Sequence, residues 1–321
     1  MSTSDIVVIT GASSGIGRTT ARMLAARGAR LVLVARSRTA LEEVASECRS
    51  MGTQAQTHAA DVTDHEAMLE VANETVATFG RLDAWVNAAA VASYGRLTDL
   101  PIEEVCRVLD VNVMGYVNGC RAAANAMGDR AAVIVNVASI VGKVPQPYTA
   151  PYDMSKAAVL ALGASMRSEL ALDGRKLHVV RIVPPTIDTP FFGHAGNHVD
   201  RELVALPPVY PPEAVARRIV EAIRHPRKQE RVVGMFGRAL VLLHRVTPRL
   251  TEGMMAFQTV WGQFGRSGAP RSSGTLFVAT ERDDATGGWH GARRRNVRVV
   301  LGIAALAAFA MTLRRTRVSF R

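Results

Sequence analysis

Short apolar runs alternate with longer amphipathic stretches along residues 1–237, and this alternation restricts the possible fold more than any other feature. Strands joined by helical crossovers build a parallel sheet that helices cover on both faces. The alternation therefore predicts a doubly wound α/β fold. We expect strands at residues 6–10, 31–35, 53–59, 82–86, 132–137, 177–183 and 231–234, and helices near 15–29, 38–51, 64–79, 102–127, 151–172 and 213–223.

A glycine cluster stands where the first expected strand leads into the first expected helix: residues 10–17 read Thr-Gly-Ala-Ser-Ser-Gly-Ile-Gly. Glycines here permit a tight turn and let backbone N–H groups approach a pyrophosphate at the positive end of the helix. The alternative interpretation is an ordinary turn. The position favours a Rossmann-type dinucleotide site, with contacts from Gly11, Ser13, Ser14, Gly15, Ile16 and Gly17.

Basic side chains follow the second expected strand, which ends at Ala35 and continues with Arg36 and Arg38. A carboxylate at this point would accept hydrogen bonds from the free ribose hydroxyls of NAD, whereas a guanidinium pairs with a 2′-phosphate. Arg18 lies just past the third glycine and favours the same phosphate. The alternative is a solvated surface pair. The pattern predicts NADP(H) as the preferred cofactor, bound through Arg36, with NAD(H) as the second choice.

Three residues with acid–base chemistry follow the strand at residues 132–137. They are Ser139, Tyr152 and Lys156, and the last two share one face of an expected helix. A phenol titrates near pH ~10, so proton transfer near neutrality requires stabilisation of its anion, which an ammonium one turn away provides. A tyrosine and a lysine at this spacing also occur by chance on surface helices, but here they follow a strand of a sheet that already carries a predicted dinucleotide site.

Taken together, these motifs resemble the short-chain dehydrogenase/reductase family from about residue 5 to about residue 235. The resemblance covers the glycine motif, Ser139, and Tyr152 with Lys156. Further matches follow the third and fourth expected strands and lie in the fourth expected helix, at Asp61, Val62, Asn87, Asn112 and Gly115.

The resemblance implies a role for each matching residue. Tyr152 would exchange a proton with the substrate oxygen, Ser139 would hydrogen-bond that oxygen, and Lys156 would lower the pKa of Tyr152 and hold the nicotinamide ribose. Asn112 would anchor a water molecule that relays protons. The remaining matches would contact the cofactor: Asp61 and Val62 at the adenine, and Asn87 beside the fourth strand.

Two departures from the family pattern concern the cofactor site. Residues 87–90 read Asn-Ala-Ala-Ala, where the family has a second asparagine and a glycine. A proline, Pro185, replaces the family's glycine after Pro184, which removes a backbone donor and conformational freedom. The segment that follows would still let Ile187 and Thr189 approach the nicotinamide carboxamide.

The proline-rich residues 184–212 interrupt the alternation, and a segment of this length is typical of a functional loop. We predict a lid over the substrate pocket, with a structural excursion as the alternative. An apolar substrate is indicated by Phe191, Phe192, Leu203, Leu206 and Tyr210. His194 and His198 are interpreted as loop surface rather than metal ligands, and the three cysteines have no metal-site spacing, so we predict no metal.

The positive charge is concentrated towards the C-terminus: residues 1–212 carry a net charge of −2 and residues 213–321 carry +13. We interpret residues 238–296 as a partly ordered basic linker with helical stretches near 238–244 and 254–264, and the uncharged residues 297–313 as an apolar helix. This helix would lie in or across a membrane, with lipid contact through residues 293–317, or dock on protein. Nucleic acid ranks lower, because aromatic interleaving and a reading module are missing.

The sequence thus predicts an NADP(H)-dependent oxidoreductase that interconverts an alcohol and a ketone or aldehyde. A non-catalytic nucleotide-sensing scaffold tethered to a membrane is the alternative, which the complete set of Ser139, Tyr152 and Lys156 disfavours. The supply of NADP points to the cytoplasm, with membrane anchoring through the C-terminal helix. The resemblance implies a homo-dimer or tetramer.

Overall fold

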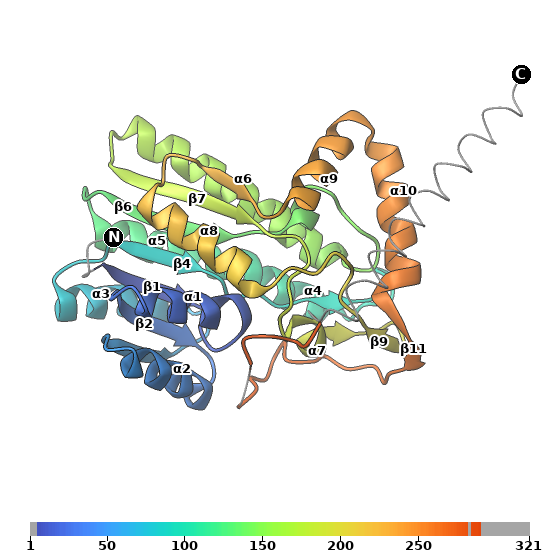
Figure 1. The fold of residues 1–321 in the computed structure, drawn as a ribbon, viewed down its shortest axis with the longest axis horizontal. Helices are drawn as coiled ribbons and strands as arrows, with labels where there is room; N and C mark the ends of the chain where they lie inside the picture. The colour runs from blue at the N-terminus through green and yellow to red at the C-terminus, as the bar shows by residue number, and fades with distance from the viewer. Residues whose placement is uncertain (1–4, 282–283, 290–321) are drawn as a thin grey trace, which may run out of the picture.

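The computed structural model describes residues 5–281 and 284–289 and is built around one parallel sheet of seven strands (Figure 1). Every neighbouring pair in the sheet runs parallel. The doubly wound Rossmann-type α/β fold is therefore confirmed. In spatial order the strands are β10 (Glu230–Val232), β7 (Leu177–Val183), β6 (Ala132–Val137), β4 (Ala84–Asn87), β1 (Ile6–Thr10), β2 (Arg30–Ala35) and β3 (Ala55–Ala59).

Helices cover both faces of the sheet because the central strands are apolar on both sides. In β1, Val7 and Ile9 belong to one buried cluster, whereas Val8 between them belongs to another. Successive side chains of a strand point to opposite faces, so each strand supplies two cores. The first cluster includes residues of α1 (Gly15–Ala25), α2 (Arg38–Ser50) and α8 (Pro212–Arg224); the second includes residues of α3 (His65–Phe79), α5 (Gly115–Met127) and α6 (Ala150–Leu172).

The helix expected at residues 102–127 is interrupted in the structure. It forms α4 (Ile102–Leu109), a π-helical turn η1 (Asp110–Met114) and α5. The periodicity of the apolar residues passes through the interruption, which is why the sequence does not reveal it. Short π-helical turns inside helices are frequent at functional sites, and this one carries Asn112.

The predicted lid at residues 184–212 contains three short elements. α7 (Phe191–His194) is followed by β8 (Gly196–Asn197), which pairs with β5 (Ser93–Tyr94), and by β9 (Arg201–Leu203), which pairs antiparallel with β11 (Phe264–Gly268). The lid is therefore tied to the body of the domain through β5 and to the C-terminal region through β11.

The two helical stretches expected at the start of the linker region are regular helices in the structure. α9 (Met235–Val246) and α10 (Pro248–Gln258) form a helical hairpin, followed by a π-helical turn η3 (Thr259–Gln263) and β11. Leu240 and Met255 are buried in a cluster with residues of β7 and α6. Leu240 of α9 and Met255 of α10 thus pack both helices on the domain.

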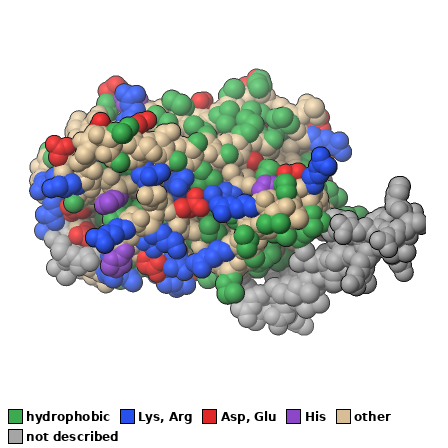
Figure 2. All heavy atoms as spheres, turned by 90° about the horizontal axis from the view of Figure 1, so that it is seen from above, with side chains coloured by type: hydrophobic (Ala, Val, Ile, Leu, Met, Phe, Trp, Pro, Cys, Tyr) green, Lys and Arg blue, Asp and Glu red, His purple; other side chains and the backbone are tan. Residues whose placement is uncertain are grey.

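The outer surface of this hairpin is rich in exposed apolar side chains, among them Met235, Leu242 and Val246, with Trp261 just beyond α10. Figure 2 shows hydrophobic side chains gathered at this end of the molecule and basic side chains in a band across the same view. Within the described residues, no helix has the length and apolar character needed to cross a membrane. The predicted apolar helix at 297–313 and the lipid contact at 293–317 lie outside the described residues.

Candidate active site

The glycine turn between β1 and α1 has the close approaches that require glycine. Gly11 has a φ of +66°, and a Cβ there would lie 2.7 Å from the backbone of Ala89. A Cβ on Gly17 would lie 2.0 Å from the carbonyl oxygen of Gly11. Thr10 completes the turn, because its Oγ1 accepts hydrogen bonds from the backbone N–H groups of Ala88 and Ala89. The turn thus presents bare backbone at the N-terminus of α1, the arrangement that binds a phosphate.

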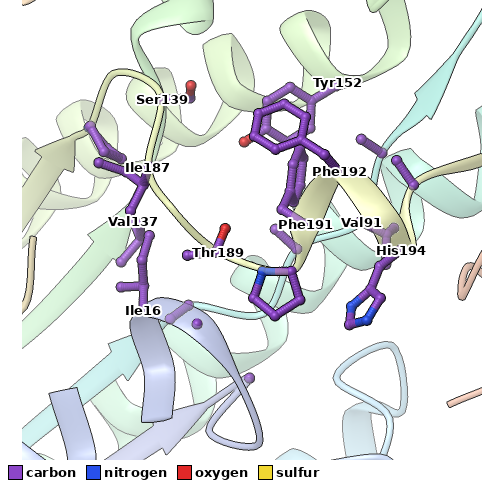
Figure 3. Close-up of a pocket in the computed structure, with 18 of the residues that line it drawn as sticks. Ile16, Val91, Val137, Ser139, Tyr152, Ile187, Thr189, Phe191, Phe192 and His194 are labelled. Atoms are coloured by element: carbon purple, nitrogen blue, oxygen red, sulfur yellow. The ribbon is translucent and has the colours of Figure 1, made fainter. Parts of the chain in front are cut away.

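A cavity of about 280 Å³ lies at the carboxyl ends of the central strands, where open α/β sheets bind ligands. It extends from the glycine turn to the lid, and Figure 3 shows Ile16, Val137, Ser139, Tyr152 and Thr189 arranged around it. Most of the residues predicted from the sequence line this one cavity: Gly11, Ser13, Ser14, Gly15, Ile16, Gly17, Arg36, Asp61, Val62, Ser139, Tyr152, Lys156, Ile187 and Thr189.

The acid–base group is assembled from β6 and α6. Ser139 follows β6, and Tyr152 and Lys156 lie one turn apart on α6. The Lys156 Nζ is 5.6 Å from the centre of the Tyr152 ring and donates hydrogen bonds to the Val137 carbonyl oxygen at 3.0 Å and the Tyr116 hydroxyl at 3.3 Å. The spacing predicted from the sequence therefore places a phenol, a hydroxyl and an ammonium at one end of the cavity.

Burial shifts the pKa values of this group. It raises the pKa of Tyr152 far above that of a free phenol, and neighbouring Asp153 adds to the effect, whereas a hydrogen bond with Ser139 opposes it. Burial also lowers the pKa of Lys156 to about 7. Each charged form alone is penalised by desolvation, so an anion at Tyr152 and a cation at Lys156 would stabilise one another. Perturbed pKa values in a cleft are typical of functional sites.

The two predicted asparagines lie behind the cavity wall rather than on it. Asn112 is fully buried in η1, where its Oδ1 accepts from the Val91 N–H and its Nδ2 donates to the Val91 carbonyl oxygen and to Ser155 Oγ. It thereby links the segment after β4 to α6. Asn87 accepts a hydrogen bond from the Trp85 indole and donates to Asn136 Oδ1. Both side chains support the walls of the cavity, and their predicted roles with water and cofactor stay predictions.

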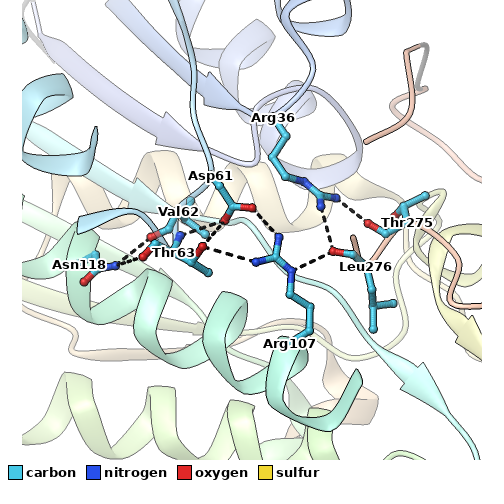
Figure 4. A network of polar contacts seen from close by, with 8 residues as sticks. All are labelled: Arg36, Asp61, Val62, Thr63, Arg107, Asn118, Thr275 and Leu276. Carbon is cyan, nitrogen blue, oxygen red and sulfur yellow. Dashed lines mark hydrogen bonds and ion pairs between the residues drawn. The ribbon is translucent and has the colours of Figure 1, made fainter. Parts of the chain in front are cut away.

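The opposite end of the cavity, beside β2, is a polar network (Figure 4). Asp61 accepts hydrogen bonds from Thr63 and from Arg107 on α4. Burial raises the pKa of Asp61, but these donors outweigh burial and hold the pKa below its usual value. Val62 is nearly buried, and its carbonyl oxygen accepts from Asn118. The predicted pair therefore lies at the end of the cavity where the resemblance implies an adenine site.

Arg36 enters the same network but binds backbone oxygens. Its guanidinium donates to the carbonyl oxygens of Thr275 at 2.6 Å and Leu276 at 2.9 Å, and Arg107 also donates to Leu276. Burial lowers the pKa of Arg36. The sequence indicates Arg36 at this end of the cavity but gives no sign of Arg107 or residues 275–276. The acceptors are main-chain oxygens about 240 positions away in the chain, so no side-chain pattern could have revealed them.

The lid supplies an aromatic wall. The Phe191 ring lies 5.2 Å from that of Tyr152 and 5.6 Å from that of Phe192, which lies 6.0 Å from Trp289. Thr189 is close to the glycine turn, because a Cβ on Gly15 would be 3.1 Å from its Cγ2. Of the five apolar residues predicted for the substrate, Phe191, Phe192 and Leu206 line the cavity, whereas Leu203 and Tyr210 do not.

The C-terminal hairpin adds apolar lining that the sequence assigns to a linker. Phe236, Leu240 and Met255 all line the cavity. Met255 also serves helix packing, because it is buried among the core residues. Apolar residues recur at helical spacing from residue 236 onward. This pattern in the sequence could have indicated that the hairpin has an apolar face.

The two lid histidines are not simply loop surface. His194 lines the cavity. The His198 side chain is 10% exposed, and its Nε2 lies 3.0 Å from the buried carboxylate of Glu104. The interpretation as loop surface is therefore wrong for His198, because Glu104 anchors the lid through it. Among the described residues, no group of three or more His, Cys, Asp and Glu side chains could hold a metal ion.

The chain is similar in sequence to a known family and to proteins named as oxidoreductases. The family model described as "short chain dehydrogenase" matches residues 5–199. YxnA of Bacillus subtilis, named an oxidoreductase, is 37% identical over 278 residues, which cover 85% of this chain and 78% of that protein. EphD of Mycobacterium tuberculosis, named a probable oxidoreductase, is 35% identical over 260 residues, but the match spans only 43% of its length.

Two solved structures share the fold. The alcohol dehydrogenase of Thermococcus sibiricus, complexed with 5-hydroxy-NADP, has a TM-score of 0.64 and 27% identity, and the match covers 72% of this chain and 96% of that chain. A short-chain dehydrogenase/reductase of Burkholderia phymatum, in complex with NAD, has a TM-score of 0.68 and 25% identity, with coverages of 78% and 95%. The two neighbours carry different nicotinamide cofactors.

Proposed function

The chain belongs to the short-chain dehydrogenase family, and we propose that it is an NADP(H)-dependent oxidoreductase that interconverts an apolar alcohol and its ketone or aldehyde. The observation that carries this proposal is the grouping of Ser139, Tyr152 and Lys156 at the end of a cavity that begins at a glycine turn. Family membership supports an oxidoreductase with a nicotinamide cofactor; the NADP preference and the substrate class are our inference.

The residues present fit a dinucleotide. Side chains on Gly11 or Gly17 would close the turn, so the bare backbone at the start of α1 is available to a pyrophosphate. At the β2 end, Arg36 offers a guanidinium that matches a 2′-phosphate. At the β6 end, Lys156 lines the cavity and would hold the nicotinamide ribose. When bound, the cofactor supplies or accepts the hydride.

The protein's own part in the reaction is proton transfer and orientation. The substrate oxygen would lie between the hydroxyls of Ser139 and Tyr152, because both residues line the same end of the cavity. Tyr152 donates its proton to that oxygen during reduction and recovers it during oxidation. The nearby Lys156 ammonium stabilises the phenolate that forms. The aromatic wall of Phe191 and Phe192 excludes water and favours an apolar substituent.

Replacement of Tyr152 by Phe tests the proposal. The variant lacks only the hydroxyl, so we expect turnover of a panel of apolar ketones and aldehydes to fall about 10²–10⁴-fold, followed through NADPH absorbance. The Kd of NADPH should change little. Tyr148→Phe is the matched control, because Tyr148 packs on Phe264 outside the proton-transfer group. Unchanged turnover in Tyr152→Phe would contradict the mechanism, and no turnover by the unaltered chain across the panel would contradict the proposed reaction.

A further inference from the structure

The mouth of the cavity is crossed by residues 272–281 and 284–289, here called the C-terminal strap. It begins at the lid and at α4, where Ser272 pairs with Asn197 through the backbone and Ser273 Oγ donates to Glu104. It ends at Asp188, whose Oδ1 accepts the N–H groups of Gly287 at 2.9 Å and Trp289 at 2.8 Å. Between these anchors, Thr275, Ala279 and Thr280 line the cavity.

The strap binds the same donors that the proposed cofactor needs. The Gly15 N–H, at the N-terminus of α1, donates to the Asp284 carbonyl oxygen at 3.1 Å, where a pyrophosphate oxygen would otherwise bind. The Arg36 guanidinium donates to the carbonyl oxygens of Thr275 and Leu276, where 2′-phosphate oxygens would otherwise bind. Three backbone oxygens of the strap therefore occupy positions suited to oxygens of the pyrophosphate and of the 2′-phosphate.

The size of the cavity agrees with this overlap. Its volume of about 280 Å³ is below the ~300–1,000 Å³ of pockets that hold drug-sized ligands. A dinucleotide is larger than most such ligands. The small volume therefore agrees with the strap contacts in indicating that the cofactor end is partly filled by the protein itself.

We propose that the C-terminal strap competes with the cofactor for Gly15 and Arg36 and thereby weakens the apparent affinity of the chain for NADP and for NAD. This inference rests on the proposed function of the cavity. Either cofactor breaks the contacts between the strap and Arg36. A 2′-phosphate replaces them with charge-assisted hydrogen bonds, whereas NAD leaves a partly buried guanidinium without equivalent acceptors. Displacement of the strap costs the same for both cofactors, and the 2′-phosphate alone gives NADP its advantage.

Leu276→Ser loosens the strap, because the Leu276 side chain is 0% exposed and its apolar packing is lost. The carbonyl oxygen of the same residue accepts hydrogen bonds from Arg36 and Arg107, so the change acts where the strap holds both side chains. Val278→Ser is the matched control: it makes a similar change in the same strap, where the side chain is 73% exposed. In calorimetric titrations of the full chain, we expect Leu276→Ser to lower the Kd of NAD⁺ and the Kd of NADP⁺ by a similar factor of about three to ten. Val278→Ser should leave both Kd values within about twofold of the unaltered chain.

Hydrogen exchange on the unaltered chain provides a second test that needs no variant. Saturating NADP⁺ should accelerate exchange of the amides of Gly287 and Trp289, because the strap leaves Asp188 when it is displaced. Slower exchange across the strap, or weaker binding of both cofactors by Leu276→Ser, would overturn the inference, since the strap would then close over the cofactor instead of competing with it.

The two proposals fail in different ways. If the unaltered chain binds NADP⁺ and the variants match it in both Kd values, the strap inference fails and the proposed function stands. If neither the unaltered chain nor Leu276→Ser binds either cofactor, the dinucleotide site itself is wrong, and the strap inference fails with it.

Discussion

The two ends of the cavity are built in different ways. The catalytic end takes Ser139, Tyr152 and Lys156 from β6, α6 and the segment between them, which are close in sequence. The opposite end takes Arg36 from the end of β2, Arg107 from α4, and Thr275 and Leu276 from the C-terminal strap. The catalytic end is thus fixed by the core of the fold, whereas the cofactor end depends on a segment that joins it from far along the chain.

This difference predicts that mutations at the two ends alter different kinetic quantities. At the catalytic end, Ser139→Ala removes one of two hydroxyls directed at the substrate oxygen. We expect kcat to fall about 10²–10³-fold with the Kd of NADPH unchanged, because the lost hydrogen bond acts on the developing charge. Ser168→Ala on the exposed face of α6 is the control. A fall in cofactor affinity of similar size would mean that the two ends are not separate.

At the cofactor end, Arg36→Ala removes the proposed ligand of the 2′-phosphate. We expect the Kd of NADPH to rise about 10–100-fold and that of NADH to change much less, while kcat at saturating cofactor stays the same. The neighbouring exposed Arg38→Ala is the matched control. Equal changes in both Kd values would show that Arg36 does not contact the phosphate.

The smallest expected effect is a pH dependence of stability that arises at the catalytic end. Burial lowers the pKa of Lys156 from its ordinary value of 10.5 to about 7 in the folded chain, so between these values the unfolded state binds more protons. Stability from this group is complete above pH 10.5 and is lost as the pH falls towards 7, with ~2 kcal/mol of the loss between pH 9 and pH 7.

The pH effect can be isolated with Lys156→Met. Urea unfolding at pH 7 and pH 9 should show a smaller rise in the free energy of unfolding for this variant than for the unaltered chain. Identical slopes in the two proteins would contradict the assignment to Lys156. Arg36→Ala should leave the slope unchanged, because Arg36 stays protonated throughout this pH range.

Strands and helices are predicted well from the sequence where apolar residues follow a single strand or helix period. The alternation in β1 and the spacing of Tyr152 and Lys156 on α6 both follow from backbone geometry, so the residue pattern alone is enough to infer them. The break of the helix at η1 cannot be inferred in this way, because it depends on the tertiary contacts of Asn112 with Val91 and Ser155. The sequence indicates helical stretches in α9 and α10 but not their packing on the domain, since the burial of Leu240 and Met255 depends on a surface formed by distant elements.

By itself, the sequence determined the doubly wound fold, the glycine turn and the acid–base group, because these depend on local periodicity and on residue types with few alternative uses. Only the tertiary structure decided what Arg36 binds and what covers the cofactor end. Those contacts use backbone carbonyl oxygens of Thr275, Leu276 and Asp284. Every residue has such an oxygen, so its identity as a partner is set by where the chain lies in space.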